Sequence, residues 1–106
     1  MAKLTFEVSH ALPKEEARQR IEQLTLYWKS KYGLKSEWTG DEATLAGKVM
    51  GVTIDGIVRV AADRVGGDAT DPGLLLRGQA RKYLQGKFAN YLDPKKSLAE
   101  LKREQD

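Results

Sequence analysis

The chain has 106 residues, of which 41% are apolar and 31% are charged. This length accommodates one domain and leaves no room for a second, and the composition is that of a folded chain and excludes wholesale disorder. Eighteen basic residues stand against 15 acidic ones, so the formal net charge is only +3. Such a small excess permits contact with an anionic partner without requiring it.

The absence of cysteine excludes a disulfide framework, a thiolate metal site and a cysteine nucleophile. No apolar run approaches the roughly 20 residues of a membrane-spanning helix. The first residues alternate in polarity and lack the apolar block of a signal peptide. We therefore expect a soluble, cytoplasmic protein with no membrane span.

The first two predicted elements are a strand and a long helix. Residues 3–9 alternate between apolar and polar side chains, which is typical of a half-buried strand. Pro13 is suited to the first turn of a helix, and Gly33 is suited to a left-handed C-terminal cap. Between them, one helical face carries Ala17, Ile21, Leu24, Trp28 and Tyr32. The pattern predicts a helix over residues 13–32.

Four further strands are predicted over residues 34–38, 43–49, 52–60 and 64–70, separated by turn signals such as Met50-Gly51. The segment 52–60 alternates most clearly. The segment 64–70 is the weakest prediction, because Gly66 and Gly67 have no side chains to pack. Short connections between successive strands indicate an antiparallel meander.

A second helix is predicted over residues 74–92, after the break at Asp71-Pro72-Gly73. Its apolar residues recur every four positions, but Gly78 and Gly86 each lower its intrinsic stability by about 1 kcal/mol relative to alanine. Beyond it, Ser97 and Glu100 form a capping-box pattern in a polar tail. We expect this tail to form at most a short, weakly docked helix.

The element order β-α-β-β-β-β-α predicts an α+β fold with two layers. We expect an antiparallel meander sheet of four to five strands with both helices on one face, forming a single domain over residues 1–93, followed by the tail at 94–106. The uncovered face is predicted to carry Lys3, Thr5, Glu7, Thr44, Lys48, Thr53, Asp55, Ile57 and Arg59. It has no aromatic side chain and mixed charges, which argues against an RNA-binding sheet.

Candidate catalytic and metal-binding residues are few. His10, the single histidine, is either a general base or a side chain that hydrogen-bonds to a loop, and we favour the second interpretation. The segment 63–73 holds three aspartates and three glycines but lacks the ligand spacing of a calcium loop, and turn formation explains it equally well. We therefore expect no catalytic residue, no metal, no cofactor and no enzymatic activity.

A concentration of basic residues marks the second predicted helix, where Arg77, Arg81, Lys82 and Lys87 are the candidate partner-binding residues. They could meet phosphates, an anionic surface or an acidic protein, or they could form an ordinary solvated face. Tyr27 lies off the apolar stripe of the first helix and, with Leu26, is expected to form an exposed contact patch.

Five segments in this order resemble one protein family. They are His10-Ala-Leu-Pro, Glu15-Glu16-Ala17, Gly40-Asp41, Gly51-Val-Thr-Ile-Asp-Gly-Ile-Val-Arg-Val60 and Gly73-Leu-Leu-Leu-Arg77. Over residues 4–92 the chain is similar to the polyhydroxyalkanoic acid system proteins, the polyhydroxyalkanoate granule-region family. The resemblance implies a small bacterial protein linked to storage-polyester metabolism, and it brings no catalytic residues. Gly66-Gly67 and Gly78-Gln79 depart from the more apolar strand and more aromatic helix start of the family.

The favoured hypothesis is a non-enzymatic accessory protein that contacts a polymer granule or a protein partner through the basic helix and neighbouring apolar residues. Two alternatives stay open. One is a regulator that binds nucleic acid through the same helix, and the other is a carrier of a small hydrophobic ligand between sheet and helices.

Overall fold

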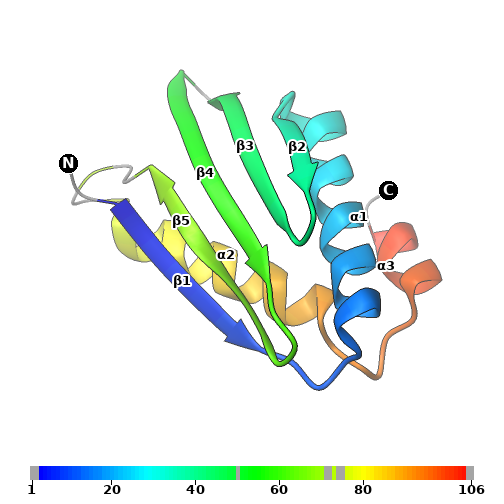
Figure 1. Ribbon diagram of the computed structural model, residues 1–106. Helices are drawn as coiled ribbons and strands as arrows, with labels where there is room; N and C mark the ends of the chain where they lie inside the picture. Colours follow the sequence, from blue (N-terminus) through cyan, green and yellow to red (C-terminus); the bar gives the residue numbers. More distant parts are fainter. Residues whose placement is uncertain (1–2, 50, 71–72, 74–75, 105–106) are drawn as a thin grey trace.

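The computed structural model describes residues 3–49, 51–70, 73 and 76–104. The elements are β1 (Lys3–Ser9), α1 (Lys14–Tyr32), β2 (Lys35–Thr39), β3 (Glu42–Val49), β4 (Val52–Val60), β5 (Arg64–Thr70), α2 (Arg77–Tyr91) and α3 (Leu98–Glu104) (Figure 1). The predicted α+β order is confirmed. Met50 of the expected turn and the helix start at residues 74–75 lie outside the described residues.

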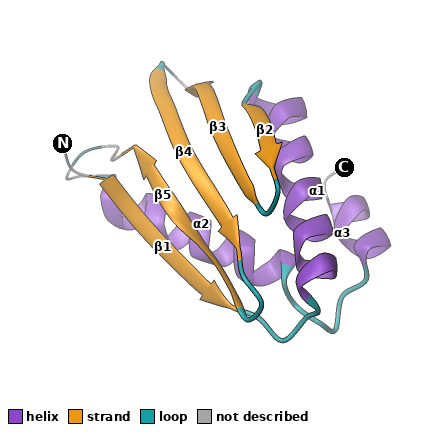
Figure 2. Cartoon of the chain, in the orientation of Figure 1, coloured by secondary structure: helices purple, strands orange, loops and turns teal. Residues whose placement is uncertain are grey.

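The sheet is antiparallel throughout, with the strand order β1-β5-β4-β3-β2. Strands β2 to β5 form the expected meander. The first strand, β1, pairs with the last strand, β5, at one edge of the sheet. Helices α1 and α2 cover one face of the sheet and leave the other face open (Figure 2). The weakest predicted strand, β5, is therefore an internal strand with neighbours on both sides.

Helix α1 follows the expectations from its sequence closely. Its first turn contains Glu15 and Glu16, whose negative charges favour a helix N-terminus. Gly33 ends it with φ 73°, and the Gly33 amide donates to the Lys29 carbonyl at 3.0 Å. The predicted apolar stripe is buried up to Trp28, and Tyr32 is partly buried against the core.

Phe88 of α2 is the centre of the core and is fully buried. Its ring stacks on Phe6 of β1 with the centroids 4.9 Å apart, and it meets the Trp28 ring of α1 edge-on at 5.9 Å. Both arrangements are favourable for aromatic pairs. One side chain thus joins the sheet to both helices.

The C-terminal tail is docked, which corrects the expectation of a loosely attached end. Leu101 of α3 is fully buried in the core cluster. The preceding loop is held by Arg20 of α1, whose guanidinium donates to the Asp93 carbonyl at 2.8 Å and to the Lys96 carbonyl at 2.6 Å. The predicted cap is also present, since the Glu100 amide donates to the Ser97 hydroxyl at 3.2 Å.

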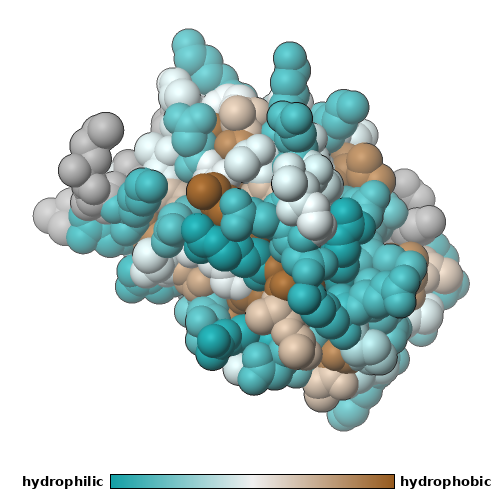
Figure 3. Space-filling view, in the orientation of Figure 1, coloured by the Kyte–Doolittle hydropathy of each residue, from teal (hydrophilic) through white to brown (hydrophobic). Residues whose placement is uncertain are grey.

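The open face of the sheet is polar, as predicted (Figure 3). Part of its charge is paired: Arg59 lies 3.1 Å from Glu42 and 3.9 Å from Asp68, and Arg64 lies 3.8 Å from Glu7. The strand registers place no aromatic side chain on this face among the described residues. The face therefore lacks the stacking platform of an RNA-binding sheet.

Candidate functional site

The four predicted partner-binding residues of α2 do not share one surface. Arg77 and Arg81 lie one turn apart, with Arg77 partly buried and Arg81 exposed beside β1. Lys82 is turned about 100° from Arg81 and is exposed on the back of the helix. Lys87 lies on the flank that faces α1. This separation gives little support to nucleic-acid binding, which favours a continuous row of cations.

Lys87 instead belongs to a group of five side chains between the two helices, which we call the tyrosine–lysine cluster. Its members are Tyr27, Lys31 and Tyr32 from α1 and Tyr83 and Lys87 from α2.

The cluster places two ammonium groups against the Tyr27 ring. The Lys31 Nζ lies 5.5 Å from the ring centroid and donates a hydrogen bond to the Tyr27 hydroxyl at 3.0 Å. The Lys87 Nζ lies 5.2 Å from the same centroid. Both distances are within the range of cation–π attraction. The cluster therefore presents positive charge and hydrogen-bond donors on an aromatic base.

Two phenols of the cluster differ in acidity. Partial burial raises the pKa of Tyr83 to about 12, against the effect of the hydrogen bond that Trp28 Nε1 donates to its hydroxyl at 3.3 Å. The hydrogen bond from Lys31 lowers the pKa of Tyr27, and the same bond raises the pKa of Lys31. The two phenols therefore ionise on opposite sides of the ordinary value of 10.0.

A titration followed by tyrosinate absorbance should separate these phenols. Tyr27 should ionise before Tyr83, and Tyr83→Phe should remove a step near pH 12. Since folded Tyr83 holds its proton to about pH 12, whereas the phenol of the unfolded chain ionises near 10.0, its contribution to stability is complete below pH 10 and is lost between those values. Ionisation of Tyr27 and Tyr83 in a single common step would contradict the described cluster.

Exposed apolar side chains accompany the cluster on the helical side. The exposed large hydrophobic residues of the described chain are Leu26 at 50%, Leu76 at 49% and Tyr83 at 41%. Leu26 projects into solvent as expected, whereas Tyr27 turns toward α2 and packs partly against the core. Of the two residues of the predicted contact patch, Leu26 is exposed to solvent, and Tyr27 belongs to the tyrosine–lysine cluster.

His10 has the structural role that we favoured. Its Nε2 lies 3.0 Å from the Ala61 carbonyl, and its Nδ1 accepts a hydrogen bond from the Leu12 amide at 3.1 Å. Both ring nitrogens are therefore engaged by backbone, and they tie the end of β1 to the β4–β5 connection. Within the described residues, no three histidine, cysteine, aspartate or glutamate side chains are grouped to hold a metal ion.

Among the hollows at the surface of the described residues are two with volumes of about 670 and 530 Å³. The larger one borders β1 and α2, and the smaller one lies where β1 runs into the following loop, beside Leu92. The space under the sheet around Phe6, Trp28 and Phe88 is filled by their rings. This packing gives little support to a ligand held between sheet and helices.

Comparison with known proteins identifies one family. A family model described as "putative polyhydroxyalkanoic acid system protein" matches residues 4–95, which run from β1 past the end of α2. No curated protein and no solved structure matches the chain. None of the described helices combines the length and apolarity needed to cross a membrane. Because the family model covers most of the sequence, the chain belongs to the polyhydroxyalkanoic acid system protein family.

Proposed function

We propose that the protein is a non-enzymatic accessory protein of the polyhydroxyalkanoate system that contacts the granule surface with its helical side. The observation that carries this proposal is the location of the exposed apolar side chains. Leu26 and Tyr83 project from α1 and α2, and Leu76 immediately precedes α2. The open face of the sheet, by contrast, is polar and pairs part of its charge internally. Membership of the family supplies the link to the polymer.

The chemistry of the helical side suits a polyester surface. Such a surface offers alkyl groups and ester carbonyl oxygens, which accept hydrogen bonds but donate none. Leu26 and Tyr83 provide apolar area, whose burial stabilises contact at about 25 cal/mol per Å². Lys31 and Lys87 provide donors that remain close to the surface because they lie over tyrosine rings.

Co-sedimentation with purified granules tests the proposal. The wild-type protein should pellet with granules stripped of their proteins, and Leu26→Glu should weaken this binding about tenfold, since it places a charge at the contact. Thr44→Glu is the matched control, because it introduces the same charge on the exposed open face and should bind normally.

Each alternative result has a defined meaning. Failure to pellet with either stripped or intact granules would contradict granule contact altogether. Binding to intact granules alone would make a granule protein the partner, in place of the polymer. Binding that is lost in Thr44→Glu and retained in Leu26→Glu would move the contact to the open face.

A further inference from the structure

Strand β1 is an edge strand with unpaired backbone groups. The His10 amide donates to the directly opposite Asp63 carbonyl, and the Ala61 amide donates to the opposite Arg64 carbonyl, each at 2.8 Å. Antiparallel ladders alternate between bonded and non-bonded pairs. The backbone groups of Leu4, Phe6 and Val8 therefore form hydrogen bonds with β5. Those of Thr5 and Glu7 point to the free edge.

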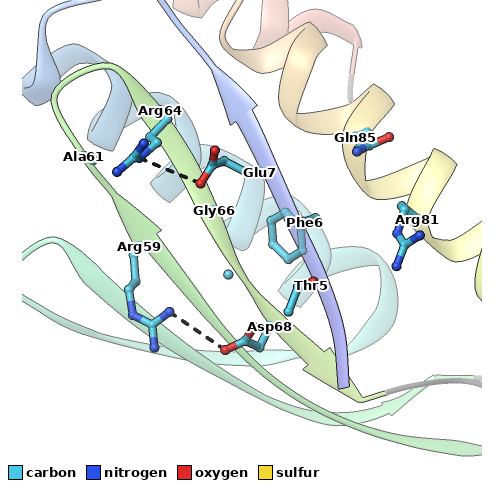
Figure 4. Close-up of a pocket in the computed structure, with 11 residues that line it drawn as sticks. Thr5, Phe6, Glu7, Arg59, Ala61, Arg64, Gly66, Asp68, Arg81 and Gln85 are labelled. Atoms are coloured by element: carbon cyan, nitrogen blue, oxygen red, sulfur yellow. Dashed lines mark ion pairs between the residues drawn. The ribbon is translucent and has the colours of Figure 1, made fainter. Parts of the chain in front are cut away.

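Helix α2 forms a second wall beside this edge. The larger hollow extends over both sides of β1. Its lining includes Arg81 and Gln85 of α2 on the unpaired side, and residues of β4, β5 and their connection on the other side, with Thr5, Phe6 and Glu7 of β1 between them (Figure 4). In Figure 4, Arg81 and Gln85 lie on the side of β1 opposite to β5, which is the unpaired side. A groove between a free strand edge and a helix is the arrangement to which extended peptides add as an extra strand in several recognition domains.

The charge on the helix side of the hollow favours an acidic occupant. Of the three arginines in the lining, Arg59 and Arg64 lie over β4 and β5 near the carboxylates of Glu7 and Asp68, and Arg81 lies on the helix side (Figure 4). Arg59 and Arg64 are each paired with one of these carboxylates. No ion pair of the described residues includes Arg81, and it is exposed. The uncompensated charge therefore lies on the helix side of the groove.

We propose that an extended, acidic segment of a partner protein binds in this groove as a sixth strand beside β1. Its backbone pairs with the outward amide and carbonyl groups of Thr5 and Glu7. Successive side chains of a strand point to opposite faces, so every second residue faces α2, and a carboxylate at one such position meets Arg81. The specificity of the groove thus resides in alternate residues of the partner.

This inference goes beyond granule contact and does not depend on it. Tyr83 and Lys87 lie on the flank of α2 that faces α1, whereas Arg81 and Gln85 lie on the flank beside β1. The two surfaces are separate, so one molecule of the protein can contact a granule and bind a peptide segment at the same time. An accessory protein built this way would join a peptide-bearing partner to the surface that its helices contact.

Selection of a displayed library of random linear peptides on the wild-type protein tests the inference. The enriched peptides should carry acidic residues at alternating positions, and their affinity can then be measured by fluorescence anisotropy. Thr5→Pro should weaken the binding at least about tenfold, because it removes the outward amide and leaves the ladder to β5 intact. Arg81→Glu should weaken it similarly, and Lys82→Glu, on the back of α2, should leave it unchanged.

Three results would overturn the proposal. One is that no peptide is enriched, and another is that the enriched peptides bind Thr5→Pro and Arg81→Glu as they bind the wild type. The third is a dimer of the protein alone that Thr5→Pro abolishes, since a second copy would then occupy the edge. If Thr5→Pro fails to fold, as judged by circular dichroism, Arg81→Glu decides the question, because an exposed side chain is replaced there.

Discussion

Replacing Gly67 with alanine should destabilise the protein by about 3 kcal/mol or prevent folding. Gly67 lies in the middle of β5, directly between Phe6 of β1 and Val58 of β4. A Cβ atom at this position would stand 1.9 Å from the Ile57 carbonyl oxygen and 2.9 Å from its carbon. These are backbone atoms of the adjacent strand, so no rotamer change can move them away. The two strands would have to separate.

Urea denaturation of two glycine variants measures this effect against a matched control. Gly78 of α2 has open space where its Cβ would be, so Gly78→Ala should gain about 1 kcal/mol from helix propensity. The same chemical change is thus expected to have opposite signs at the two positions. A Gly67→Ala protein with the wild-type denaturation midpoint would show that β4 and β5 are not as close as described.

The sequence predicted β5 as its weakest strand; the structure confirms this strand over Arg64–Thr70 and gives the reason for its weak pattern. Alternation and side-chain size identify strands that pack through their own side chains, as in β4. In β5, by contrast, Gly67 has no side chain, and this allows the backbone of β4 at Ile57 and Val58 to lie close to it. The partner on one side, β1, lies about 60 positions earlier in the sequence. No local pattern contains that pairing, so fold class was predictable and strand order was not.

The sequence identified some residues of the candidate site from their charge, but it did not predict which of them lie together in space. Counting charges on α2 identified Lys87, but its contact with Tyr27 joins two helices that are distant in the sequence. A local signal did exist for the other half of the cluster, because Tyr27 and Lys31 are four residues apart and neighbours on a helix surface. The groove beside β1 had no such signal, since Arg81 reaches the edge strand only through the tertiary fold.

The same limit explains the tail, whose docking depends on one buried arginine. Arg20 is only 3% exposed, and its neighbours in the sequence give no sign that it lies inside. It forms an ion pair with Glu16 at 3.1 Å and donates to the carbonyls of Tyr91, Asp93 and Lys96. Those carbonyls belong to the end of α2 and the loop before α3, more than 70 positions away.

Arg20→Ala should therefore destabilise the protein by about 3 kcal/mol, because it leaves several partly buried carbonyls without their donor and opens space in the core. Arg20→Lys should recover only part of the loss, since an ammonium group lacks the planar fork that reaches several acceptors at once. Arg18→Ala is the control on the same helix. Arg18 pairs with Glu22 at 2.9 Å, donates to the Gly40 carbonyl at 2.9 Å and lies 4.6 Å from the Trp38 ring centroid, but its side chain is far more exposed than that of Arg20. Its replacement should cost less than that of Arg20, about 1 kcal/mol.

Hydrogen exchange distinguishes local release of the tail from a general loss of stability. In Arg20→Ala the amides of α3 and of the loop before it should exchange faster than those of β4 under native conditions, because Leu101 remains in the core only while the loop is held. Equal acceleration in β4 and α3 would mean that Arg20 stabilises the whole domain rather than anchoring its end. If Arg20→Ala and Arg18→Ala were equally stable, the buried guanidinium of Arg20 would not have the stabilising role proposed for it.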